Sequence, residues 1–91
     1  MPANVTETGQ YTNLSASALV RTGSCQLLGV FCASSSSGTL KLWDQTSAAA
    51  PICVNTFNLI GGTFYPIGAT LVNGLYATIA NTADVTIIWT V

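Results

Sequence analysis

The sequence predicts an all-β fold, a small antiparallel β-sandwich of the jelly-roll type with seven to eight short strands. Its apolar residues occur in short runs or alternate with polar ones, and turn-forming residues recur every eight to twelve positions. No stretch shows the periodicity of an amphipathic helix. Short strands at this spacing are typical of a sandwich or a small barrel, and 91 residues correspond to one domain.

The strongest strand signal lies in residues 25–44. Residues 25–32 are apolar and branched, residues 39–43 alternate between apolar and polar, and four serines between them lead to Gly38. An apolar strand, a Ser/Gly turn and an alternating strand predict a β-hairpin with a loop longer than two residues. Gly29, in the middle of the first strand, predicts a bulge or a close approach of two backbones.

The remaining chain divides into an arm and further strands. Residues 1–10 are polar without periodicity, which predicts a flexible N-terminal arm before a sandwich domain of residues 11–91. Pro66 lacks an N–H and is expected at an edge or a strand end, and Asn73-Gly74 predicts a type I′ hairpin turn. Further strands are expected over residues 14–21, 52–59, 63–65, 69–72, 75–80 and 85–91, with a loop over 44–51 and a last turn over 81–84.

Alternation within the strands predicts which side chains face the core. Leu40 and Leu42 are expected to point inward, with Lys41 and Trp43 on the opposite face. In the same way Leu75, Ala77 and Ile79 are expected to share one face, as are Val85, Ile87, Trp89 and Val91.

The composition is that of a chain covered by partners. Hydrophobic residues make up 49% of the chain and charged residues only 5%, against about 25% charged in ordinary soluble domains. Because a free monomer normally depends on a charged, patch-free surface, we expect a homo-oligomer or a place in a larger assembly. A membrane partner is not expected, since a helical span needs about 20 consecutive apolar residues and polar residues interrupt every apolar run here.

The sequence also disfavours a nucleic-acid partner and secretion. The net charge is −1, and the only cations, Arg21 and Lys41, lie far apart in the sequence. Because binding to phosphates requires several clustered cations, a nucleic-acid partner is not expected. The first residues, 1–4, contain neither a basic region nor an apolar stretch, so secretion is not expected either.

Three cysteines, Cys25, Cys32 and Cys53, fit neither a zinc motif nor a full disulfide framework. Buried free thiols are the favoured interpretation, and one disulfide from Cys53 to either of the others is the alternative. Cys25 and Cys32 are an odd number of positions apart, so on one regular strand they face opposite sides unless a bulge intervenes.

Catalysis has little support in this sequence. Histidine, the commonest general base and metal ligand, is absent. The acids are Glu7 in the arm and Asp44 and Asp84 beside turns, where Asp often accepts backbone N–H bonds. A carboxylate pair of Asp44 and Asp84 for glycoside hydrolysis is conceivable, but no third polar group accompanies it. We therefore expect no enzyme, no cofactor and no metal site.

Trp43 and Tyr76 are the candidate interface residues. Both fall on faces opposite the aliphatic residues of their strands, so we expect both to be partly exposed. Trp and Tyr are frequent interface anchors, which favours a protein interface. Stacking on a sugar, or simple covering of the second face of a thin sandwich, are the alternatives.

Several runs resemble a family of short proteins encoded in tailed-bacteriophage genomes. The resemblance covers roughly Leu14 to Thr90 and lies in turn-and-strand patterns rather than in reactive groups. The runs that carry it are Leu28–Phe31, Ser37–Asp44, Gly62–Pro66, Asn73–Ile79 and Thr82–Thr86. The sequence departs from the family pattern at Cys32, where an aliphatic residue is common, and at Trp43, where Tyr is common.

The resemblance implies a virion structural component with no catalytic residues to transfer. The expected role is a capsid decoration or cement protein, assembled in the bacterial host cytoplasm, that binds the major capsid protein or other virion proteins. A trimer is expected because capsid lattices present threefold positions. A tail, neck or fibre component is the first alternative. A carbohydrate-binding module that uses Trp43, Tyr76 and Asp44 is the second.

Overall fold

The computed structural model describes residues 9–91, which form one antiparallel sheet of six strands and contain no helix. The all-β prediction is confirmed, whereas the sandwich or jelly-roll architecture is not, because all six strands belong to one hydrogen-bonded sheet. The strands are β1 (Gln10–Leu14), β2 (Ala18–Thr22), β3 (Cys25–Trp43), β4 (Ile52–Asn58), β5 (Thr63–Leu71) and β6 (Gly74–Thr90).

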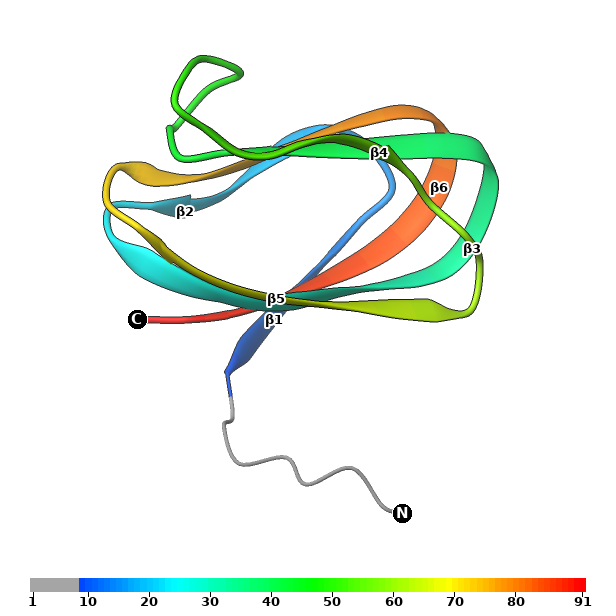
Figure 1. Cartoon of the computed structure of the whole chain (residues 1–91), viewed down its shortest axis with the longest axis horizontal. Coiled ribbons are helices and arrows are strands. Elements are labelled where there is room, and N and C mark those ends of the chain that lie inside the picture. Colours follow the sequence, from blue (N-terminus) through cyan, green and yellow to red (C-terminus); the bar gives the residue numbers. More distant parts are fainter. Residues whose placement is uncertain (1–8) are drawn as a thin grey trace.

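The long strands β3 and β6 form the centre of the sheet and pair with each other over most of their lengths. Each of them has two short neighbours on its other edge: β1 and β2 pair with β6, and β5 and β4 pair with β3. Each long strand therefore contributes one half to a first four-stranded layer and its other half to a second. Layer one has the order β1-β6-β3-β5 and layer two the order β2-β6-β3-β4, and the sheet curls so that the layers face each other (Figure 1).

Both long strands bend where the two layers meet. The register of β3 against β6 shifts after Cys32 and again at Ser37, and such bulges bend strands. Ser37 and Asn81 adopt left-handed backbone conformations, with φ of 57° and 63°. The Asn81 side chain donates a 2.7 Å hydrogen bond from Nδ2 to the carbonyl oxygen of Ser37, which ties the two bends together.

The predicted hairpin in residues 25–44 is therefore wrong. The serines bend one continuous strand, and β6 pairs with that strand on both sides of the bend. The predicted turn at residues 81–84 is wrong for the same reason, because it is the matching bend in β6. These two mergers, together with that of the predicted strands at 63–65 and 69–72 into β5, reduce the eight predicted ranges to five, and the division of the predicted strand 14–21 into β1 and β2 gives the six observed.

The prediction for Pro66 is confirmed, and the turn type predicted for the Asn73-Gly74 pair is wrong. β5 continues through Pro66 to Leu71, but it pairs only with β3, so the predicted edge position of Pro66 is confirmed. Neither Asn73 nor Gly74 has a positive φ, and β5 and β6 each pair with β3 rather than with each other. The turn is therefore not a type I′ hairpin.

The N-terminal region contains two strands where one was predicted over 14–21. β1 and β2 are separated at residues 15–17 and join different layers. The Ser17 hydroxyl accepts a 2.9 Å hydrogen bond from the Ile79 N–H. Of the predicted arm, residues 1–8 lie outside the described part, and Gln10 begins β1. The loop over 44–51 is confirmed, and the strand predicted over 52–59 is observed one residue shorter.

The core lies between the layers and takes side chains from both. Leu40 and Leu42 point inward as predicted, and so do Val85, Ile87 and Trp89, whereas Val91 is exposed. The buried apolar side chains are Cys25, Leu27, Val30, Cys32, Leu40, Leu42, Leu59, Leu71, Leu75, Ala77, Ala83, Val85, Ile87 and Trp89.

The bulge predicted at Gly29 is confirmed by a register shift between Leu27 and Gly29 against both neighbouring strands. The shift changes the alternation of β3, so Cys25 and Cys32 are both buried in the core. The exception made for a bulge therefore applies, and the two cysteines lie on the same side of β3.

Replacement of Ile87 by Asp should abolish soluble protein. The Ile87 side chain is fully buried, and an unpaired carboxylate in the core costs several kcal/mol. The measurement is the soluble yield after expression, with Val72→Asp at an exposed turn position as the control. A wild-type yield of Ile87→Asp would contradict the core assignment.

Replacement of Gly38 by Ala should lower the free energy of unfolding by about 1–3 kcal/mol, the usual cost of overpacking. A Cβ at Gly38 would lie 2.7 Å from the Ala83 Cβ and 2.8 Å from the Thr82 carbonyl oxygen. Urea titration measures the change. Gly68→Ala is the matched control because a Cβ there has no neighbour within 4 Å; equal losses in both variants would refute tight packing at the bend.

Candidate interaction surfaces

The two predicted interface residues, Trp43 and Tyr76, lie directly opposite each other on β3 and β6, on the outer face of layer two. Trp43 is half-buried, and its indole Nε1 donates a 2.9 Å hydrogen bond to the Thr78 hydroxyl. The Lys41 ammonium nitrogen lies 4.2 Å from the centroid of the Trp43 ring. These contacts hold the indole in one orientation and place a cation over one of its faces.

Trp43 and Tyr76 are part of a longer apolar row. Tyr76 is opposite Leu19 of β2, and Trp43 is opposite Ile52 of β4. Residues opposite each other in a sheet share a face, and Leu19 and Ile52 are 44% and 45% exposed. The row Leu19–Tyr76–Trp43–Ile52 thus crosses all four strands of layer two. Leu19 and Ile52 were missed from the sequence because alternation within one strand does not show which residues lie opposite each other on neighbouring strands.

A second apolar surface, on the outer face of layer one, was not predicted. Tyr11, Phe31 and Phe64 are 77%, 40% and 50% exposed. Phe31 of β3 is opposite Phe64 of β5. The next outward-facing row crosses β1, β6, β3 and β5 and consists of Tyr11, Ile88, Gly29 and Pro66. We call the group of Tyr11, Phe31, Phe64, Pro66 and Ile88 the aromatic ridge. The signal available in the sequence was the apolar character of both faces of residues 25–32.

Phe64 covers a position where β3 has no side chain. A Cβ at Gly29 would lie 2.5 Å from the Phe64 ring and 3.0 Å from the Tyr65 carbonyl oxygen. Only glycine leaves room for the ring to lie against the backbone. The aromatic ring shields this part of the sheet from water, as is known for glycines paired with aromatic residues in β-sheets.

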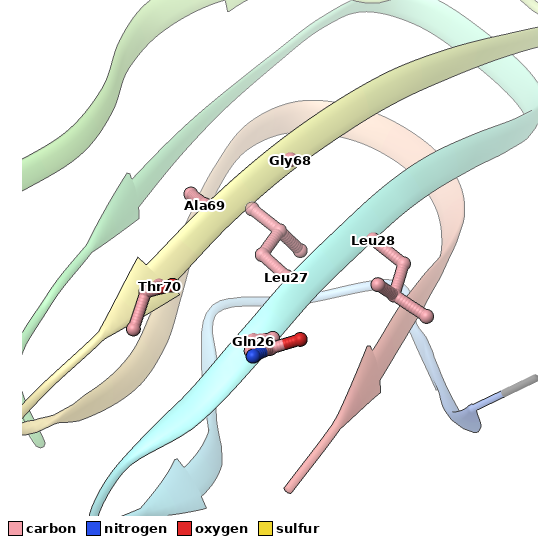
Figure 2. A pocket seen from close by; sticks show the side chains of 6 residues that line it. All are labelled: Gln26, Leu27, Leu28, Gly68, Ala69 and Thr70. Atoms are coloured by element: carbon pink, nitrogen blue, oxygen red, sulfur yellow. The ribbon is translucent and has the colours of Figure 1, made fainter. Parts of the chain in front are cut away.

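Beyond the ridge, the outer face of layer one is hollowed between β3 and β5. The hollow has a volume of about 190 Å³ and is lined by Gln26, Leu27, Leu28, Gly68, Ala69 and Thr70. Figure 2 shows Leu27 between the two strands, Ala69 at the edge of β5 away from β3, and Leu28 on the side of β3 away from β5. Gly68 leaves the floor open because it has no side chain. The hollow lies at the bulge, where β3 and β5 are out of regular register.

A third apolar surface is a groove between β4 and β5, at the open edges of the two layers. Its volume is about 240 Å³, and Val54, Phe57, Tyr65, Pro66 and Ile67 line it. The rings of Phe57 and Tyr65 meet edge to face, with centroids 5.1 Å apart. The Tyr65 hydroxyl accepts a 2.9 Å hydrogen bond from the Ile60 N–H, which joins the two edges near the β4–β5 connection.

Asp44 binds the turn between β5 and β6. One carboxylate oxygen, Oδ1, accepts hydrogen bonds from the backbone N–H groups of Val72 at 3.0 Å and Asn73 at 2.8 Å, with a longer contact of 3.4 Å to Gly74. A carboxylate that accepts several backbone donors is a local structural element. Asp44 therefore fixes the turn that was predicted to be a type I′ hairpin.

Asp84 lies at the bend, opposite Ser34, whereas Asp44 follows the far end of β3. The Oδ1 atom of Asp84 accepts a 2.7 Å hydrogen bond from the Asn13 side-chain amide. The structure thus does not bring Asp44 and Asp84 together, and each is bound by neighbouring polar groups. The arrangement gives no support to a carboxylate pair for glycoside hydrolysis.

The three cysteines are free thiols, and the predicted alternative of a disulfide is not observed. Burial raises the pKa of all three thiols above the ordinary value, with desolvation as the largest cause. A raised pKa keeps each sulfur protonated at neutral pH, and the thiol is a weak nucleophile compared with the thiolate. These side chains therefore act as small apolar groups in the structure.

Within residues 9–91, no group of three or more His, Cys, Asp or Glu side chains is placed to hold a metal ion. The same residues contain no helix that could cross a membrane. No family model, curated protein or solved structure matches the chain. The resemblance to short tailed-bacteriophage proteins therefore stays a prediction.

Replacement of Asp44 by Ala should destabilise the fold by about 1–2 kcal/mol, because backbone donors of the turn lose a charged acceptor. Asp44→Asn should recover much of this loss, since its carbonyl oxygen can accept the same bonds. Urea titration of the three proteins measures the difference. Equal stability of wild type and Asp44→Ala would show that the turn does not depend on this carboxylate.

Proposed function

We propose that this chain is a non-enzymatic structural subunit of a bacteriophage virion, with the capsid exterior as its place and decoration or cementing of the head as its role. The observation that carries the proposal is the character of the two outer sheet faces. Layer two presents an apolar row across its four strands, and layer one presents the aromatic ridge. In residues 9–91 only Arg21, Lys41, Asp44 and Asp84 carry charged side chains. Contiguous apolar surface of this kind is typical of interaction sites.

The shape supports an assembly role. Side chains from both layers share one core, so we infer that the curled sheet acts as a two-layered unit of jelly-roll type. Its extents are 33 × 33 × 18 Å, and the view down the shortest axis shows the two layers edge-on, one above the other (Figure 1). The outer faces of the two layers point in opposite directions, so one can contact a capsid and the other another copy. Many copies on a lattice gain avidity from individually weak contacts.

A tail, neck or fibre component is the runner-up, because the same faces suit any repeated virion lattice. The proposal includes a trimer, the oligomer expected from threefold lattice positions, and a mass measurement in solution would test this number. A non-catalytic role is favoured because histidine is absent from the sequence and the carboxylates and thiols described above are engaged in structure.

The carbohydrate-binding alternative is less well supported. Stacking on a sugar requires an open aromatic face, and Lys41 lies over one face of the Trp43 ring. Asp44, the proposed polar partner, is occupied by the backbone of residues 72–74. Among the interactions described above, Trp43 and Asp44 each contact other groups of the chain, and Tyr76 does not.

Fractionation of virions tests the proposal. Virions of the phage that encodes the chain are purified on a density gradient, heads and tails are separated, and the chain is detected by antibody. We expect it with the heads. Detection with tails would favour the runner-up, and absence from both fractions would refute a virion role. Glycan-array binding that is lost in Trp43→Ala would then support the carbohydrate-binding module.

Trp43→Ala should leave the fold intact and weaken attachment to heads at least tenfold, because a large anchor in the centre of the layer-two row is lost. Re-binding of the purified variant to heads stripped of the chain measures the affinity, and circular dichroism checks the fold. Thr56→Ala, at an exposed position of β4, is the control. Unchanged binding of Trp43→Ala would exclude the layer-two row as the attachment surface.

A further inference from the structure

We propose that the loop of residues 44–51 of one copy binds the groove between β4 and β5 of a second copy, so that identical chains associate head to tail. The loop connects β3 to β4, and the groove is the one lined by Val54, Phe57, Tyr65, Pro66 and Ile67. The inference deepens the proposed function by naming a partner and the two surfaces that meet. It rests on that function only in requiring that the chain works among its own copies.

The tip of the loop, residues 48–51, exposes apolar groups with no polar side chain among them. Its sequence is Ala-Ala-Ala-Pro, all four residues are exposed, and the run continues into Ile52; no exposed run of this kind in residues 9–91 is longer. Figure 1 shows the loop, in green, projecting beyond the two layers. Consecutive exposed apolar residues are unfavourable on a free surface and usual where a partner covers them. We therefore expect the tip to be covered in an assembly.

Hydrogen bonds within the loop stabilise the position of the tip. The Asp44 N–H donates a 2.9 Å hydrogen bond to the Pro51 carbonyl oxygen across the base of the loop, and the Ala49 N–H donates one of 2.8 Å to the Ser47 carbonyl oxygen. A loop that is already ordered loses little conformational entropy on binding. The tip projects beyond the layers, whereas the groove lies between their open edges, so the tip can fill only the groove of another copy.

The groove matches the tip in polarity and in size. None of its lining residues is charged, and its one polar side-chain group, the Tyr65 hydroxyl, already accepts a hydrogen bond from the Ile60 N–H. Its volume of about 240 Å³ suits small groups such as the methyl groups and the pyrrolidine ring of the tip. Grooves lined by aromatic rings, here those of Phe57 and Tyr65, commonly bind extended segments that contain proline.

The presence of both surfaces on one chain argues for a second copy as the occupant. The tip is an apolar projection and the groove an apolar hollow, so each needs a partner with the shape and polarity of the other. Every further copy supplies that partner. Binding between copies covers two apolar surfaces with one contact, whereas a different protein seated in the groove would leave the tip exposed.

The contact is heterologous, because it joins two different parts of the chain. Contacts of this type close into a ring when the rotation between neighbours allows it, and a three-membered ring would be the trimer of the proposed function. One loop in one groove buries less than the roughly 1,600 Å² of a standard interface. We therefore expect weak association in dilute solution, and a permanent contact only where many copies are held side by side.

Two variants, each with a charge on one of the surfaces, test the inference by sedimentation velocity. Ala49→Lys places an ammonium group on the tip, and Pro66→Lys places one on the exposed rim of the groove. The wild type should gain mass with concentration. Each variant alone should associate at least tenfold more weakly, because a charge would enter an apolar contact. Val72→Lys, at an exposed turn outside both surfaces, is the control and should behave like the wild type.

A mixture of the two variants distinguishes a head-to-tail contact from any other. The Pro66→Lys chain keeps an intact tip and the Ala49→Lys chain an intact groove, so an equimolar mixture should form a dimer with the affinity of the wild-type contact. This dimer should not grow, because its remaining tip and groove both carry a lysine. A wild type that stays monomeric at all concentrations, or a mixture that associates no better than either variant alone, would overturn the inference.

Cross-linking keeps the test independent of how the lysine variants fold, which circular dichroism also checks. In a mixture of Ala49→Cys and Pro66→Cys chains, a short bismaleimide should join one to the other at least tenfold more often than it joins either to itself. Equal yields of mixed and identical pairs would show that the tip does not lie at the groove.

The two proposals fail separately. If the chain associates head to tail but is absent from heads and tails, the contact stands and the virion role falls. If it is found on heads while Ala49→Lys and Pro66→Lys leave self-association unchanged, the virion role stands and this contact is wrong. Weaker re-binding of either variant to stripped heads, without a change in self-association, would assign that surface to another virion protein instead.

Discussion

The structure depends on the matched bends of β3 and β6. Each strand runs through both layers, and each can do so only if the other bends at the same place. Ser37 and Asn81 adopt left-handed conformations opposite one another, and the Asn81 amide bonds the Ser37 carbonyl. Gly38 is needed beside them because Ala83 and Thr82 leave no room for a side chain. Without this corner the sheet would be flat, and its apolar inner face would have nothing to cover it.

The corner also explains the distribution of apolar residues. A sheet of this size has two faces, and folding it on itself buries one of them completely. The other becomes the outside of both layers, where rows that include Trp43 on one side and Phe31 on the other remain exposed. A chain with so few charges has no means of making those faces hydrophilic. The high apolar content therefore fills a core and also leaves apolar side chains exposed on both outer faces.

The sequence predicted local structure well and strand connections poorly. Alternation correctly placed Leu40, Leu42 and Ile87 in the core, and Gly29 correctly indicated a bulge. Serine-rich and Asn-containing segments were interpreted as reversals of the chain, because such residues are common in turns and in bends alike. What distinguishes the two is the partner strand opposite the segment, and a partner distant in sequence leaves no local signal.

The candidate surfaces show the same limit. Trp43 and Tyr76 were identified from their strands alone, since each alternates with aliphatic residues. Their extension to Leu19 and Ile52, and the whole aromatic ridge, depends on which strands lie side by side. A row across a sheet is a property of register, and register in this chain is set by the long central pair rather than by adjacent turns.

The position of β6 in the chain has a consequence for biosynthesis. Of the six strands, β6 is made last, yet it pairs with β1, β2 and β3. While the ribosome is still completing the chain, β1 and β2 have no neighbour, and the apolar residues of β3 have only β5 and β4. Non-local pairing of this kind folds slowly and leaves strand edges open to other chains. Newly made copies therefore pass through a period in which their open edges can pair wrongly, and closely spaced ribosomes on one message would bring such edges near one another.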